Sequence, residues 1–263
     1  MRLCTYGGRE GSRLGAGGDG TVVPLAGADV AAALDGAPAP DGDPVPLEGL
    51  ELLAPLVPGK LIGVGLNYRD HAAETGAGLP ARPLVFAKLI SSVTGPTADI
   101  VRPAYTEQLD YEGELAVVIG RRARDVPEER ALAHVFGYAV MNDVTARDRQ
   151  RDEPQWLRAK GGDTFAPFGP WVTTADEVPD PQALAIRTTV NGELRQDGAT
   201  ADMVFSVAAL VAWCSSSFTL EPGDVITTGT PAGVGVARRV FLEPGDRVRI
   251  EIPGLGALEN AVR

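Results

Sequence analysis

The sequence predicts a mainly β protein with short helices, of the α+β class. Segments typical of strands outnumber segments typical of helices, and strand and helix do not alternate regularly along the chain. Regular alternation is what a doubly wound parallel sheet would need. The tetrapeptide Glu-Pro-Gly-Asp occurs at 221–224 and again at 243–246, each time just before a strand-like segment. Proline and glycine at its two central positions favour a tight turn.

The first part of the chain, 1–57, is rich in glycine, proline and alanine and predicts a small N-terminal subdomain. Residues 1–6 and 21–25 are short β-like stretches. The alanine-rich segment 29–34 favours a short helix. Four prolines between 36 and 46 predict a loop.

The remainder, 58–263, predicts the larger, catalytic domain. The apolar run at 60–66 suits a buried strand, and Asn67 can cap a short helix after it. Further strands are predicted at 84–88, 115–120, 136–142, 171–173, 185–190, 225–229 and 247–252. Helices are predicted at 67–75, 127–134, 145–152 and 206–217.

The composition excludes several classes of protein. The 263 residues carry a net charge of -11, which argues against nucleic-acid binding and against docking on anionic membranes. No apolar run approaches the roughly 20 residues of a membrane span, and the first residues lack the apolar core of a signal peptide. Two cysteines do not make a disulfide framework. We therefore expect a cytoplasmic protein with a small-molecule substrate.

Glu112 and Glu114 lie in the strand-like segment LDYEGELAVVIG. A spacing of two places both side chains on one face of a strand, where two adjacent like charges are unfavourable. A cation between them would remove the repulsion, and Gly113 leaves the opposite face uncrowded. The alternative is a pair of solvent-facing acids on an edge strand.

Asp143 ends the strand-like run FGYAVMND and is either a helix N-cap or a third oxygen ligand. Three carboxylates, with no cysteine nearby and only two histidines in the chain, favour Mg²⁺ or Mn²⁺, with Ca²⁺ as an alternative, over zinc. Arg147 and Gln150 are three residues apart on the following helix and share a face. That face either points toward the same site as Asp143 or is solvated.

His71 and Glu74 are three residues apart in LNYRDHAAETG and adjacent on a helix. A carboxylate beside an imidazole orients the ring and favours its role as a base. A surface pair is the alternative. The glycines at 76 and 78 would let this segment move as a lid.

Lys160 is one of only three lysines among 24 basic residues and lies beside two glycines in LRAKGGDTFAPFGPW. It can hold an anionic substrate group or be a solvated loop lysine. Thr230 lies in DVITTGTPAGVG, a strand that runs into a glycine-rich loop whose N–H groups can bind an anion. The loop matches neither a phosphate loop nor a dinucleotide fingerprint.

The order of these segments resembles the fumarylacetoacetate hydrolase family. The resemblance rests on VGLNYRDHAAE, DYEGELAVVIG, GYAVMNDVTARDRQ, AKGGDTFAPFGPW and LEPGDVITTGTPAGVG, and it covers 58–263, with weaker similarity before. It implies a mixed β-roll that is usually a homodimer and that requires Mg²⁺ or Mn²⁺. The loop 76–82 offers only Arg82 as an acid-recognising residue, which leaves the distal group of the substrate open.

The resemblance also implies a role for each candidate residue. The metal ligands would be Glu112, Glu114 and Asp143, the pair that activates water would be His71 and Glu74, and the residue that contacts substrate would be Lys160. Arg147, Gln150 and Thr230 would line the same site, and Lys88 in VFAKLISS matches the family's phenylalanine-x-lysine position.

The function implied is that of an enzyme acting on a 2-oxo or 2,4-dioxo acid through a metal-bound enolate. Hydrolysis of an acylpyruvate, decarboxylation of oxaloacetate and isomerisation of a hydroxymuconate-like diacid share this strategy, so the metal residues cannot separate them. The presence of His71 and Glu74 favours hydrolysis. A catalytically silent relative that binds a metal or ligand is the alternative from another class.

Overall fold

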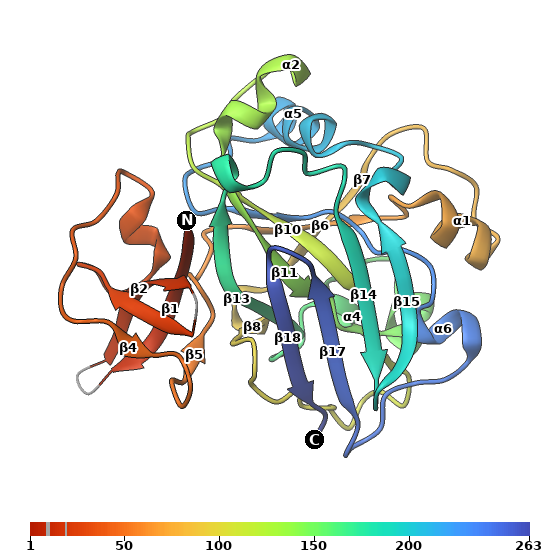
Figure 1. Cartoon of the computed structure of the whole chain (residues 1–263). Helices are drawn as coiled ribbons and strands as arrows, with labels where there is room; N and C mark the ends of the chain where they lie inside the picture. The colour runs from red at the N-terminus through yellow and green to blue at the C-terminus, as the bar shows by residue number, and fades with distance from the viewer. Residues whose placement is uncertain (9–10, 19) are drawn as a thin grey trace.

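The structure, a computed structural model, describes residues 1–8, 11–18 and 20–263. It confirms a mainly β protein with short helices (Figure 1). A 12-stranded sheet carries a four-stranded sheet against its central strands, and a separate two-stranded pair completes the β structure. The large sheet is mixed. Parallel pairs join β6 (Leu61–Gly65) to β16 (Val225–Thr227) and β8 (Val93–Thr94) to β13 (Ala166–Thr174).

The N-terminal strands form one wing of the large sheet. They are β1 (Arg2–Gly8), β2 (Gly11–Gly18), β3 (Thr21–Pro24), β4 (Val45–Pro46) and β5 (Leu52–Leu53). β1 pairs with β13, with Arg2 opposite Thr173, so the wing continues directly into the central strands. The predicted helix at 29–34 is a 3-10 turn, η1 (Val30–Ala33), which the side chain of Asp29 caps.

The central strand β10 (Gly113–Ile119) lies between β11 (Val135–Asn142) and β16. All seven of its residues are buried. Leu115 and Val117 face the core shared with the four-stranded sheet, whereas Ala116 and Val118 face the core shared with the N-terminal wing. A strand buried on both faces has a nearly continuous apolar sequence. The same alternation places Glu114 on the face of Ala116.

The four-stranded sheet has the order β15-β14-β17-β18 and lies in front of the central strands in Figure 1. Its strands are β14 (Ala185–Val190), β15 (Glu193–Ala199), β17 (Arg247–Ile252) and β18 (Gly256–Ala261). Ile186, Ile250 and Leu258 are fully buried in the same core as Leu115. Burial of each such side chain contributes about 1.5–3 kcal/mol, which holds the two sheets together.

The remaining elements are short. β7 (Leu84–Lys88) pairs with β6 at the edge of the large sheet, and β9 (Leu109–Asp110) pairs with β12 (Thr145–Ala146). The helices are α1 (Arg69–Thr75), α2 (Glu128–Ala131), α3 (Arg147–Asp152), α4 (Leu157–Lys160), α5 (Val207–Ser217) and α6 (Gly235–Arg238). Four more 3-10 turns are η2 (Ile90–Ser92), η3 (Leu132–His134), η4 (Ala175–Glu177) and η5 (Thr200–Asp202). Among the described residues, no helix has both the length and the apolar character needed to cross a membrane.

Both Glu-Pro-Gly-Asp segments form the predicted turns. The backbone N–H of Asp224 donates to the carbonyl of Glu221, and that of Asp246 donates to Glu243, each at 3.0 Å. The glycines have φ angles of 87° and 100°, which a type II turn requires at its third position. The first turn is followed directly by β16 and the second by β17.

Among the longer strands, β2, β15 and β18 were not predicted. The two-residue strands β5 and β8 were not predicted either, β4 falls in the predicted loop 36–46, and β12 falls in the predicted helix 145–152. β2 reads GSRLGAGG and β15 reads ELRQDGA, so neither shows an apolar run. One signal for β15 does exist. Asn191 and Gly192 link it to β14 and both have positive φ, 53° and 80°, as the two-residue turn of a tight hairpin requires.

The prediction that Asn67 caps helix α1 is wrong. Tyr68 holds the cap position, and the side chain of Asn67 is fully buried among other groups. Its amide nitrogen donates to the carbonyl of Thr228 at 2.8 Å, and its amide oxygen accepts from the backbone of Phe205 at 2.9 Å. Asn67 therefore joins the start of α1 to the loop after β16.

Candidate active site

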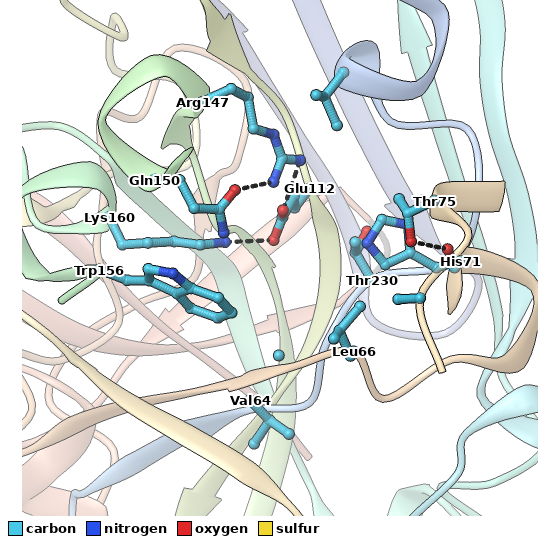
Figure 2. Close-up of a pocket in the computed structure, with 13 residues that line it drawn as sticks. Val64, Leu66, His71, Thr75, Glu112, Arg147, Gln150, Trp156, Lys160 and Thr230 are labelled. Carbon is cyan, nitrogen blue, oxygen red and sulfur yellow. Dashed lines mark hydrogen bonds and ion pairs between the residues drawn. The ribbon is translucent and has the colours of Figure 1, made fainter. Parts of the chain in front are cut away.

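A cavity of about 250 Å³ opens between α1, α3, α4 and the loop after β16 (Figure 2). Figure 2 shows Lys160 and His71 on opposite sides of it, with Glu112 between them. Its lining consists of Val64, Gly65, Leu66, His71, Thr75, Ala77, Glu112, Arg147, Gln150, Trp156, Lys160, Thr230 and Val236. Six of the predicted site residues thus line one cavity, although they come from distant parts of the chain.

Glu112, Glu114 and Asp143 form a buried cluster in which one carboxylate oxygen from each lies within 4.8 Å of the others. Glu112 and Glu114 share a face because they are two residues apart in extended chain, Glu112 just before β10 and Glu114 within it. Asp143 follows β11, and its N–H donates to the carbonyl of Glu112 at 2.9 Å. The three acids are at most 5% exposed, so solvent-facing acids are excluded. Asp143 is not a helix cap either, because β12 intervenes before α3.

Glu114 is the acid of this cluster with the fewest hydrogen-bond partners at its carboxylate. Its Oε2 accepts from the N–H of Gly229 at 2.9 Å, but its buried Oε1 has no partner among the described residues. Burial raises the pKa of Glu114 well above its usual value, and the carboxylates of Asp143 and Glu112 raise it further. An unpartnered carboxylate oxygen among three buried acids fits a hard divalent cation. These three residues could hold a divalent metal ion.

Two lysines form ion pairs with the acid cluster. Lys160 Nζ lies 2.7 Å from both Glu112 Oε2 and Asp143 Oδ2, and Lys88 Nζ lies 2.5 Å from Asp143 Oδ1. Burial alone would raise the pKa of Glu112, but Lys160 and Arg147 hold it at about 2. Both lysines are almost fully buried, so Lys160 is not a solvated loop residue. Lys88 lies outside the cavity lining.

Arg147 links the acid cluster to a fourth buried acid, Asp110. Its Nε donates to Asp110 Oδ2 at 2.7 Å, its Nη2 lies 2.7 Å from Glu112 Oε1, and its Nη1 donates to Gln150 Oε1 at 2.9 Å. Asp110 also accepts from the N–H groups of Gly235 and Val236 at the start of α6. Arg147 and Gln150 do share one face, and it points into the site.

His71 and Glu74 lie across the cavity from Lys160. His71 Nδ1 is 3.4 Å from Glu74 Oε2, and His71 is only 7% exposed. The N–H of Gly233 donates to both oxygens of Glu74 at 2.9 and 3.0 Å. A side chain at Gly233 would come within 2.0 Å of the carbonyl of Arg195 and its φ is 107°, so only glycine permits this contact. The exposed loop 76–82 follows α1.

Several residues of the site were not predicted, among them Asp110, Trp156 and Gln196. Fully buried Gln196 donates to Thr230 Oγ1 at 2.7 Å and to the carbonyl of Pro231 at 2.8 Å. Its Oε1 accepts from the N–H of Gly113 at 3.0 Å. Gln196 therefore joins the glycine between the two glutamates to the loop that carries Thr230. Only the hairpin turn before β15 could have indicated that this residue is placed in a sheet.

Both parts of the chain match known family models. Residues 60–263 match the family model for the C-terminal part of fumarylacetoacetate (FAA) hydrolase, and residues 1–55 match the model for a Rv2993c-like N-terminal part. Protein Rv2993c of Mycobacterium tuberculosis is 46% identical over 227 residues, which cover 86% of this chain and 84% of that protein.

Two solved structures show the same fold over the whole chain. A fumarylacetoacetate hydrolase from Exiguobacterium antarcticum has a TM-score of 0.92 at 39% identity and covers 100% of this chain and 99% of its own. A 2-hydroxyhepta-2,4-diene-1,7-dioate isomerase from Mycobacterium marinum has a TM-score of 0.87 at 40% identity, with 100% and 98% covered. The mixed β-roll expected from the sequence is therefore confirmed. The chain belongs to the fumarylacetoacetate hydrolase family.

Proposed function

We propose that this protein is a divalent-metal-dependent hydrolase that cleaves a carbon–carbon bond in a 2,4-dioxo acid of the acylpyruvate type. The proposal rests on two groups of residues that face each other across one cavity. A cluster of three buried acids with an unpartnered oxygen lies on one side. A histidine held by a glutamate lies on the other. Hydrolysis needs both, a charge stabiliser and a base.

The acids Glu112, Glu114 and Asp143 would hold the cation, which is Mg²⁺ or Mn²⁺ because all ligands are hard oxygens. When bound, it would supply positive charge where negative charge develops on the 2-oxo group of the substrate as the bond breaks. Lys160 and Arg147 keep Glu112 ionised, as its low pKa indicates, and so keep the cluster ready for a cation.

His71 is proposed to remove a proton from the attacking water. In the tautomer whose Nδ1 carries the proton, that proton is donated toward Glu74 Oε2, 3.4 Å away. The lone pair of Nε2 is then free to accept the proton of a water in the cavity. Gly233 fixes Glu74 through both carboxylate oxygens, so the imidazole is held in one orientation.

The remaining lining residues are proposed to bind the substrate. Lys160 lies on the cavity wall with its ammonium group next to Glu112, where it can also attract the acid group of the substrate. Gln150 is held by Arg147 through its oxygen, so its amide nitrogen can donate to a substrate carbonyl. Thr230 is held by Gln196. Lys88 would act through Asp143.

A second candidate is isomerisation of a hydroxymuconate-like diacid. It is favoured by the similarity to solved structures of isomerases, among them a 5-carboxymethyl-2-hydroxymuconate delta-isomerase from Mycobacterium smegmatis at 41% identity. Isomerisation moves a double bond and needs no attacking water. In that reaction His71 and Glu74 would not serve to generate a nucleophile.

The test is a panel of acetylpyruvate, oxaloacetate and an unsaturated hydroxy diacid, each assayed with added Mg²⁺ or Mn²⁺ and with a chelator. We expect acetylpyruvate to release pyruvate and acetate, and we expect the chelator to abolish the reaction. Faster turnover of the diacid or of oxaloacetate would replace hydrolysis by isomerisation or decarboxylation. Metal binding without turnover of any of the three would favour a catalytically silent relative.

We also predict a homodimer, as the family resemblance implies. β7 is the edge strand of the large sheet, and Leu84, Leu89 and Ile90 on and beside it are 41%, 45% and 36% exposed. An unpaired edge with exposed apolar residues favours pairing with a second chain. Light scattering should give twice the chain mass. The double variant L89E/I90E should dissociate the dimer, and a dimer of unchanged stability would exclude this edge as its interface.

A further inference from the structure

Given the proposed function, we infer that the substrate is a monoacid whose C4 substituent is apolar, and that Trp156 forms the wall against which this substituent packs. The cavity has two chemically different halves. Acidic, basic and amide side chains make up one, whereas Val64, Gly65, Leu66 and Trp156 make up the other. Figure 2 shows Val64, Leu66 and Trp156 on the side away from Arg147.

The indole ring of Trp156 packs against a second aromatic ring and against the backbone. Its ring packs edge-on against Phe86, with the ring centres 5.4 Å apart and the planes at 67°. It also lies directly over Gly65, because a Cβ built at Gly65 would come within 2.7 Å of the indole. A ring held by an aromatic neighbour and by backbone offers an apolar surface of constant shape.

No cation remains to bind a second carboxylate within the lining. Its two basic side chains are already paired, Arg147 with Asp110 and Glu112 and Lys160 with Glu112 and Asp143. Arg82, the acid-recognising candidate of the sequence, is exposed and does not line the cavity. A second carboxylate in the apolar half would be buried without a partner, which is strongly unfavourable.

The first experiment compares two substrates of equal length, 2,4-dioxoheptanoate, which ends in a methyl group, and 2,4-dioxoheptanedioate, which ends in a carboxylate. We expect kcat/KM to be at least about 100-fold higher for the monoacid, since only the diacid buries an unpaired charge. Equal values, or a preference for the diacid, would overturn the inference while leaving the proposed hydrolysis in place.

Five variants at three positions locate the effect. Leu66→Lys should raise the ratio of diacid to monoacid cleavage at least about 10-fold, and Leu66→Met, which has no charge, should not. Trp156→Ala should raise KM for the monoacid more than it lowers kcat, and Trp156→Phe should restore most of the loss. Arg82→Ala should leave the ratio unchanged. A selective loss of diacid cleavage in Arg82→Ala would show that the loop supplies the missing cation and would overturn the inference.

A binding measurement separates the inference from the proposed function. The unreactive pair 2-oxoheptanoate and 2-oxoheptanedioate lacks the C4 carbonyl and cannot be cleaved. In calorimetry with the Mn²⁺-loaded protein, tighter binding of the monoacid would support the apolar half even if neither dioxo acid is hydrolysed. Equal or tighter binding of the diacid would overturn it.

Discussion

Replacing His71 with alanine is expected to lower kcat for acylpyruvate cleavage by about 10²–10⁴-fold, the usual contribution of a general base. Mn²⁺ affinity should be nearly unchanged, because His71 forms no hydrogen bond or ion pair with the three acids and lies across the cavity from Lys160. Glu74→Gln should act in the same direction but more mildly. Its amide oxygen can still accept from Gly233 and from His71 Nδ1, and only the charge that favours the imidazolium is lost.

The control for this variant is His134→Ala, which replaces the second of the two histidines. His134 contacts the carbonyls of Arg121 and Arg122 and does not line the cavity, so kcat should not change. Decarboxylation of oxaloacetate, if present, should fall less than hydrolysis in His71→Ala because it needs no attacking water. Equal losses on both substrates would mean that His71 serves binding or closure rather than proton transfer.

Glu114→Gln is expected to weaken Mn²⁺ binding by more than about 10-fold. Even residues that only contact metal ligands are worth about 10–100-fold in affinity, and Glu114 is proposed to be a ligand itself. The same variant should melt at a higher temperature than the wild type in the presence of a chelator. It removes a carboxyl group whose ionised form is disfavoured by burial and by Asp143 and Glu112, as its raised pKa indicates, and its amide oxygen can still accept from Gly229.

Weaker Mn²⁺ binding together with a higher melting temperature distinguishes a metal ligand from an acid that only stabilises the fold. Glu48→Gln, at an exposed acid, is the matched control and should alter neither quantity. Calorimetry with Mn²⁺ and thermal melting with and without chelator give both measurements. Unchanged Mn²⁺ binding together with a lower melting temperature would show that Glu114 stabilises the sheet and holds no cation.

The acid cluster could be predicted because it depends on local geometry. The alternation of side chains in extended chain brings Glu112, just before β10, and Glu114, within it, to one face whatever surrounds them. Asp143 could be added only as one of two alternatives, since its place beside Glu112 depends on the pairing of β10 with β11. The same holds for His71 and Glu74. Their helical spacing was visible, but the burial of His71 depends on packing that no local pattern reports.

Residues that join distant segments could not be predicted. Asp110 is bound to Arg147 and to the start of α6, and no pattern near Asp110 indicates either partner. Gln196 lies in a polar strand that reads as a loop, yet it connects Gly113 to Thr230. Trp156 is one of three tryptophans, and only its contact with Gly65 and Phe86 shows that it belongs to the cavity.

The parallel pairing of β6 with β16 has a consequence for how the chain folds. It joins Leu61 to Val225, so most of the polypeptide must be closed into a loop before the pair forms, which slows folding. During synthesis, β10 and β6 leave the ribosome long before β16 can lie between them. Gly229, the backbone partner of Glu114, arrives later still. Fragments that stop before β16 therefore expose two open strand edges, and such edges promote aggregation.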